Sequence, residues 1–201
     1  MIHRTRRAGP GAFATSVVVT LLVVACGSTS HPTESSDDVT AMAERVEELD
    51  AAVQSWADSG TIEDAHVWAE TALNLVVGPN GPGYGDLNGD GTISGESDAG
   101  VLPGLDGTPP GLASPLAPNA CVERDVLGGD WSDPEQRWAT MADAIEAWAP
   151  DNNTMPSLPS HPMRVVGWAT FTLDSDTLDL AHEYASHAGL HVSVTERALD
   201  C

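Results

Sequence analysis

The sequence predicts an all-α protein, a small bundle of four to five helices with one long Gly/Pro-rich insertion. Three observations lead to this fold class. Apolar residues recur every three or four positions in several stretches, which is the period of an amphipathic helix. Capping residues precede these stretches, and several of them end at glycine or proline. The insertion, residues 79–130, holds most of the chain's glycines and half of its prolines, and it shows no such period.

Two helices are expected in the N-terminal half. Residues 37–58 form the first, which Ser36 or Asp37 caps and Ser59-Gly60 ends. The second begins at Thr61 and stops at Gly78-Pro79, and the short hinge between the two makes them antiparallel neighbours. The apolar stripe of the first helix consists of Val39, Met42, Val46, Leu49, Val53 and Trp56.

The C-terminal half supplies the remaining helices. Asp133-Pro134, a cap followed by a helix-starting proline, opens one that runs to about residue 149. The next covers residues 160–173. Its β-branched run 165–172 would also suit a strand, but an isolated strand has no partner in this sequence. The last helix covers residues 177–199.

The charge of the chain excludes one class of partner. Among 201 residues there are 8 Lys+Arg, all of them Arg, against 30 Asp+Glu, and the formal net charge is −22. Because such an acidic chain repels a phosphate backbone, no nucleic-acid partner is expected. A hydrophobic content of 41% is enough for a folded core.

The N-terminus has the pattern of an export signal. Arg4, Arg6 and Arg7 precede an apolar run over residues 12–25, which is shorter than the roughly 20 residues of a spanning helix. The run ends in Val23-Val24-Ala25-Cys26. This ending resembles the bacterial lipobox, and the resemblance implies cleavage before Cys26 and lipidation of that residue.

The resemblance also implies an organisation and a location. Residues 1–25 would be a lipoprotein signal peptide, 26–36 a Ser-rich flexible tether, and 37–201 a single helical domain with the insertion. The protein would be anchored to the cell membrane through lipid on Cys26, on the extracytoplasmic side. The expected role is to bind a protein partner on the cell surface. The membrane leaflet and the identity of the partner stay open.

With Cys26 carrying lipid, two cysteines remain. Cys121 and Cys201 would lie in an oxidising compartment, where paired thiols form a disulfide. A disulfide that closes a loop of about 80 residues stabilises a fold by on the order of 4 kcal/mol in the chain-entropy model.

The insertion contains a candidate calcium site. The run Asp86-Leu87-Asn88-Gly89-Asp90-Gly91-Thr92-Ile93-Ser94 resembles the first nine positions of an EF-hand or dockerin-type calcium loop. The resemblance implies side-chain oxygens at positions 1, 3 and 5, a glycine turn at position 6 and a carbonyl ligand at position 7. Position 9 would ligate directly or through water, and position 8 would anchor the loop by packing. The ligands are then Asp86, Asn88, Asp90, Thr92 and Ser94.

The resemblance is incomplete at three points. Position 12 is Ser97 in place of an acid, so either Glu96 or Asp98 would have to supply the last carboxylate by a shift of the backbone. Residues 78–85 cannot form the entering helix of a full EF-hand, and no second copy of the loop exists. The expected affinity for calcium is therefore weak, roughly 10⁻⁴–10⁻³ M, which suits a structural ion outside the cell.

A second metal hypothesis rests on histidines. The segment His182-Glu183-Tyr184-Ala185-Ser186-His187 misses the HExxH zinc motif by one residue, so its histidines cannot share one helix face. Residues spaced by four form better lines on the second and last helices. A transition-metal or haem site between helices would then use His66, Glu70, Glu183, His187 and His191.

The sequence offers no catalytic constellation. It has no phosphate-binding Gly loop followed by Lys, no Gly-x-Ser-x-Gly elbow and no cysteine free to attack. The expected function is therefore non-catalytic, although an enzyme is not excluded.

Overall fold

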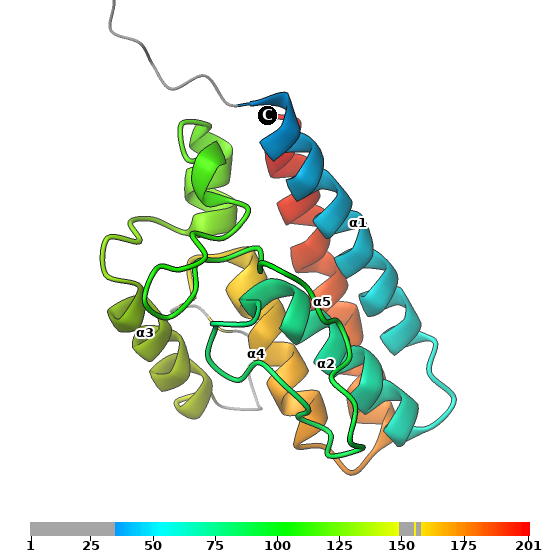
Figure 1. The fold of residues 1–201 in the computed structure, drawn as a ribbon. Helices are drawn as coiled ribbons and strands as arrows, with labels where there is room; N and C mark the ends of the chain where they lie inside the picture. Colours follow the sequence, from blue (N-terminus) through cyan, green and yellow to red (C-terminus); the bar gives the residue numbers. More distant parts are fainter. Residues whose placement is uncertain (1–34, 149–154, 156–157) are drawn as a thin grey trace, which may run out of the picture. The chain divides into compact units, whose positions relative to one another are not determined.

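Five α-helices make up most of the described residues, 35–148, 155 and 158–201, of the computed structural model (Figure 1). Two short helical turns lie between the second and third of them. Within these residues there is no strand, so the predicted all-α class is confirmed, including a helix where residues 165–172 also suited a strand. The helices are α1 (Ser36–Ala57), α2 (Ile62–Val77), α3 (Pro134–Glu146), α4 (His161–Leu173) and α5 (Leu178–Leu199), and the turns are η1 (Ser114–Leu116, 3-10) and η2 (Val122–Leu127, π).

Local capping explains where the helices begin. The Thr61 side chain accepts a hydrogen bond from the Asp64 N–H at 3.1 Å. At the start of α3, the Asp133 side chain accepts one from the Gln136 N–H at 3.1 Å. Helix α1 is capped one residue earlier than expected, by Ser35, whose hydroxyl accepts from the Asp38 N–H at 3.1 Å. The predicted helix ends are otherwise met within a few residues.

Four of the helices form a ring around one core. In the order α1, α2, α4, α5, each helix packs against the next, and α5 packs against α1. Neighbours alternate in direction, and α3 stands beside the bundle against α4 (Figure 1). The adjacent antiparallel helices α2 and α4 are thus separated in sequence by the insertion and by α3.

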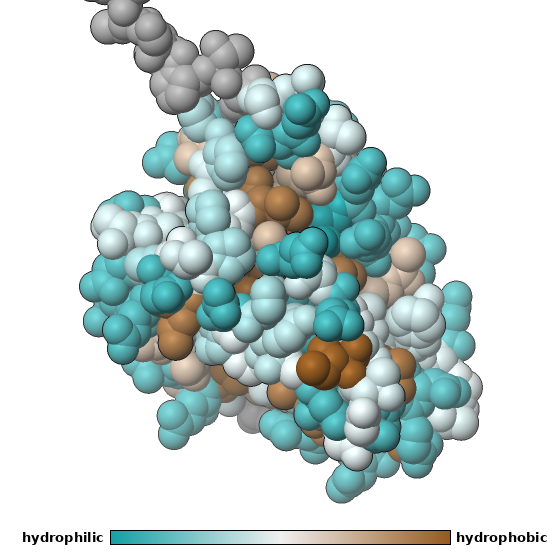
Figure 2. All heavy atoms as spheres, in the orientation of Figure 1, coloured by the Kyte–Doolittle hydropathy of each residue, from teal (hydrophilic) through white to brown (hydrophobic). Residues whose placement is uncertain are grey.

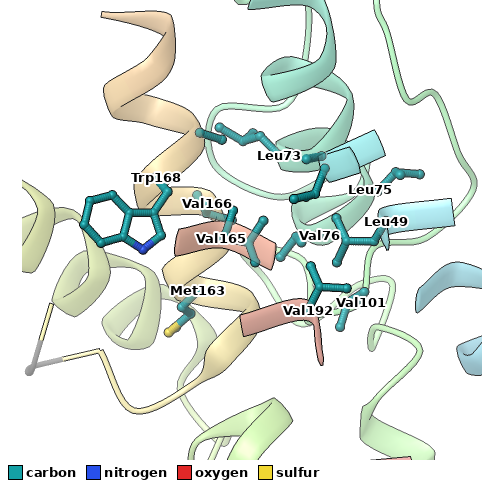
Figure 3. Packing of buried hydrophobic residues seen from close by; sticks show 14 of the residues in the cluster. Leu49, Leu73, Leu75, Val76, Val101, Met163, Val165, Val166, Trp168 and Val192 are labelled. Carbon is teal, nitrogen blue, oxygen red and sulfur yellow. The ribbon is translucent and has the colours of Figure 1, made fainter. Parts of the chain in front are cut away.

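The apolar stripes point into this ring, as the sequence predicted. Leu49 from α1, Val76 from α2 and Val192 from α5 meet near Val165 of α4 (Figure 3). One expected core position is wrong, because Val39 is 37% exposed. Most of the visible surface is hydrophilic, with apolar residues in small separate patches (Figure 2).

Part of the insertion belongs to the core. The main-chain N–H groups of Val101 and Leu102 donate to carbonyls near the end of α2, Leu75 O at 3.2 Å and Val76 O at 3.1 Å. Both side chains are fully buried. At Gly100 the two backbones come so close that a Cβ would lie 2.4 Å from Val76 O, so glycine is required there. These contacts fix the insertion to α2.

The predicted disulfide is present. Cys121 and Cys201 are bonded, with their Cα atoms 6.1 Å apart and a sequence separation of 80. The bond ties the C-terminus to the residue before η2, which itself packs against α5.

The expected membrane anchor lies outside the described residues. The signal peptide 1–25, Cys26 and nearly all of the tether fall in residues 1–34. The described residues belong to one compact unit, Pro32–Cys201. In those residues, no helix is both long and apolar enough to cross a membrane.

Candidate calcium loop and histidine pair

The aspartate at loop position 1 organises the turn. One oxygen of Asp86, Oδ1, accepts the Gly89 N–H at 2.8 Å, and its other oxygen, Oδ2, accepts the Gly91 N–H at 2.9 Å. Gly91, at position 6, has a φ of 90°, a conformation that residues with a Cβ rarely adopt. The loop therefore curls around the Asp86 carboxylate.

Positions 3 and 5 are held in the same way. Asn88 Oδ1 accepts the Asp90 N–H at 2.9 Å, and Asp90 Oδ1 accepts the Thr92 N–H at 2.7 Å. The amide nitrogen of Asn88 lies 3.3 Å from Asp90 Oδ2, so these two side chains converge.

A buried carboxylate on α2 holds the back of the loop. Glu70 is fully buried, and its Oε2 accepts the N–H groups of Leu87 at 2.7 Å and Asn88 at 2.9 Å. Its Oε1 accepts the Ser94 N–H at 2.7 Å. One side chain thus joins both ends of the nine-residue run, and its charge is balanced by oriented backbone dipoles.

One helical turn later, an amide completes the attachment. Asn74, also fully buried, donates from Nδ2 to the carbonyls of Gly85 at 2.9 Å and Ser94 at 2.7 Å. Its Oδ1 accepts the Gly85 N–H at 3.0 Å. The polar side chains of Glu70 and Asn74 are therefore both satisfied by the loop backbone.

The donor set fits a hard cation. Carboxylate and amide oxygens have two acceptor positions each, and a backbone N–H takes one of them at Asp86 Oδ1, Asp86 Oδ2, Asn88 Oδ1 and Asp90 Oδ1. Calcium prefers oxygen ligands of this kind. The residues that would hold it are Asp86, Asn88 and Asp90, with the Thr92 carbonyl, Ser94 directly or through water, and further waters.

The end of the loop departs from an EF-hand. Ser97, at position 12, accepts a hydrogen bond from Arg45 Nη1 of α1 at 3.3 Å, and the same guanidinium nitrogen donates to the Ala99 carbonyl. Glu96 and Asp98 are exposed. Among the described residues no three His, Cys, Asp or Glu side chains form a group that could hold a metal ion, so neither acid joins Asp86 and Asp90 in such a group.

The expected packing anchor at position 8 is also wrong. Ile93 is 42% exposed. Hydrogen bonds from Glu70 and Asn74 anchor the loop instead, because a short Gly-rich run offers little apolar surface for packing.

The residues of the second metal hypothesis are dispersed. His66 Nε2 lies 3.0 Å from the Ser175 carbonyl, and the Glu70 carboxylate accepts backbone N–H groups of the candidate calcium loop. Glu183 is exposed on α5. His187 stacks on Trp168, with the ring centroids 4.6 Å apart and the planes at 17°.

His191 has a different partner from the one expected. Its Nδ1 lies 3.0 Å from Nδ1 of His161, the first residue of α4. Burial lowers the pKa of His191 to about 3, with the nearby His161, Arg164 and His187 adding to the effect. Burial also lowers the pKa of His161. The nearby Arg164 and Arg197 lower it further, whereas Asp125 raises it.

The sequence placed Glu70 in the second metal hypothesis, whereas in the structure its carboxylate accepts backbone N–H groups of the loop. The four-residue spacing of His66 and Glu70 predicted that they share a face of α2, and Glu70, together with Asn74 one turn later, holds the loop backbone there. Arg45 was missed. Its signal was an arginine among the acids of α1, in a chain with few basic residues.

Comparison with known proteins gives no family for the chain: neither the protein-family models, nor the curated proteins, nor the solved structures contain a match.

Proposed function

We propose that the protein is a non-catalytic, lipid-anchored extracytoplasmic protein whose helical domain carries one calcium ion in the loop Asp86–Ser94. The ion orders the surface of the insertion for a binding or structural role. The proposed partner, which binds the ordered insertion, is a protein on the cell surface.

The observation that carries the calcium proposal is the attachment of the loop to Glu70. Its carboxylate binds the N–H groups of Leu87, Asn88 and Ser94 from the side of α2. The turn held in this way also has Asp86, Asn88 and Asp90 spaced as in a calcium loop. Because the backbone is held independently of any ion, calcium would bind with little ordering cost.

The ligand count sets the expected affinity. Two carboxylates and one amide are available, and position 12 offers Ser97, whose hydroxyl contacts Arg45. Calcium sites with few charged ligands bind at about 10⁻⁴–10⁻³ M. At the millimolar calcium found outside cells, such a site would be mostly filled, which makes the ion structural and not regulatory.

The proposed anchor rests on the lipobox-like sequence alone. Val23-Val24-Ala25-Cys26 and the basic, then apolar, residues before it support a lipidated Cys26. The disulfide between Cys121 and Cys201 supports an oxidising location.

The test is a calorimetric titration of calcium into chelator-treated protein. We expect one weak site in the wild type and none in Asp90→Ala. Asp106→Ala is the matched control, because Asp106 Oδ1 accepts the Thr108 N–H at 2.9 Å in a similar turn outside the loop. Absence of binding to the wild type, or equal binding by Asp90→Ala, would rule out the calcium proposal.

A further inference from the structure

Two imidazoles from different helices meet at the junction of α4 and α5. The Nδ1 atoms of His161 and His191 are 3.0 Å apart, and the rings are tilted by 55° with centroids 5.1 Å apart. Both residues are half-buried, so solvent reaches them. From this geometry we propose that His161 and His191 form a two-nitrogen site for copper(II), separate from the calcium loop.

The separation of the two nitrogens fits one coordination geometry. With metal–nitrogen bonds of about 2.0–2.1 Å, two ligands at a right angle lie about 2.8–3.0 Å apart, whereas tetrahedral ligands lie about 3.3–3.4 Å apart. The observed 3.0 Å matches neighbouring positions of a square-planar or tetragonal centre. That geometry with nitrogen ligands is typical of copper(II) and nickel(II), and copper(II) binds more tightly. Water would fill the other positions.

Without metal, the 3.0 Å contact is an N–H···N hydrogen bond, with one ring protonated on Nδ1. Metal binding moves that proton to Nε2 and leaves both rings neutral.

The surrounding charges are mixed. Arg164 and Arg197 disfavour a cation at this position, and Asp125 favours it. Asp125 is itself paired with Arg124 at 2.6 Å. These charged side chains are partly solvated, so water and salt screen their electrostatic effect on the site. The two nitrogens at chelating distance determine where the metal binds. The arginines weaken the affinity for it without changing the ligands.

The test is a titration of copper(II) into the full chain with excess calcium, which occupies the acidic loop. Electron paramagnetic resonance should show one copper with nitrogen ligands. His161→Gln or His191→Gln should weaken its binding by more than about tenfold. His182→Gln is the matched control, because that imidazole lies 2.9 Å from the Ser59 carbonyl and leaves the pair intact. Unchanged affinity in both pair variants, or a spectrum with oxygen ligands alone, overturns the proposal.

A second measurement needs no variant and so does not depend on folding of the mutants. In the wild type, substoichiometric copper(II) should broaden the ring resonances of His161 and His191 before those of His66 and His182. Broadening that begins at other histidines and spares this pair contradicts the site.

Discussion

The Ser94 N–H donates to Glu70 Oε1 at 2.7 Å, across 24 residues of sequence and from a loop to the fully buried face of a helix. The other oxygen of the same carboxylate accepts the N–H of Leu87 at 2.7 Å. This single side chain therefore fixes both ends of the candidate calcium loop, and the first prediction follows from it.

Replacing Glu70 with Gln should detach the loop. The amide nitrogen of Gln would face backbone N–H groups that have lost their acceptor, so we expect the free energy of unfolding to fall by about 2–4 kcal/mol. Urea denaturation measures this. Glu44→Gln, an exposed acid on α1, is the control and should change stability by less than about 0.5 kcal/mol. Equal effects of the two substitutions would contradict the attachment.

Replacing Arg45 with Gln should loosen the end of the loop. Its guanidinium bridges α1 to Ser97 and Ala99, and we expect a loss of about 1–2 kcal/mol. Hydrogen exchange should accelerate at the nearby Val101 and Leu102 amides. In the control Arg197→Gln the lost side-chain contact is to Ser193 of the same helix, so exchange at these amides should not change.

Removing the disulfide should destabilise the fold while keeping its helices. A Cys121→Ser/Cys201→Ser double variant frees a loop of about 80 residues, and the expected loss is on the order of 4 kcal/mol. Thermal unfolding with and without reductant measures it. Reductant should lower the melting temperature of the wild type and leave that of the double variant unchanged; equal shifts would contradict this assignment.

Stability should fall as pH decreases from 7.5 to 5.5 in protein free of transition metals. The pKa of His191 is about 3 in the fold, below the ordinary 6.5 of an unfolded chain, so the unfolded state binds more protons in between. His161, His187, Arg164, Arg197 and Asp125 surround the pair. Allowing for partial exposure, the loss is about 1 kcal/mol or less.

Comparing variants assigns this pH effect to the pair. His191→Gln should flatten the dependence of unfolding free energy on pH, and His182→Gln should retain it. A wild-type stability that does not change over this range would contradict the neutral imidazole pair.

The helices were predictable because their signals are local. Thr61 and Asp133 cap their helices through residues three positions away, and the apolar stripe from Met42 to Trp56 needs only the helical period. The disulfide was predictable because only two cysteines remained to pair once Cys26 was assigned to lipid.

The partners of the polar residues were not predictable in the same way. Glu70 was as compatible with a histidine across the bundle as with a loop backbone, since a carboxylate accepts from either. His161 pairs with His191 only because α4 starts at His161 beside the middle of α5, an arrangement that the tertiary packing of the two helices sets. Such contacts depend on tertiary packing, which no local period encodes.

The most direct test of the calcium proposal is the backbone amide spectrum of ¹⁵N-labelled protein during calcium titration. We expect shifts concentrated at residues 86–94 in the wild type, saturating in the millimolar range, and no such shifts in Asp90→Ala. Shifts confined to Glu96, Asp98 or other surface acids, or none at all, would show that this loop is not a calcium site.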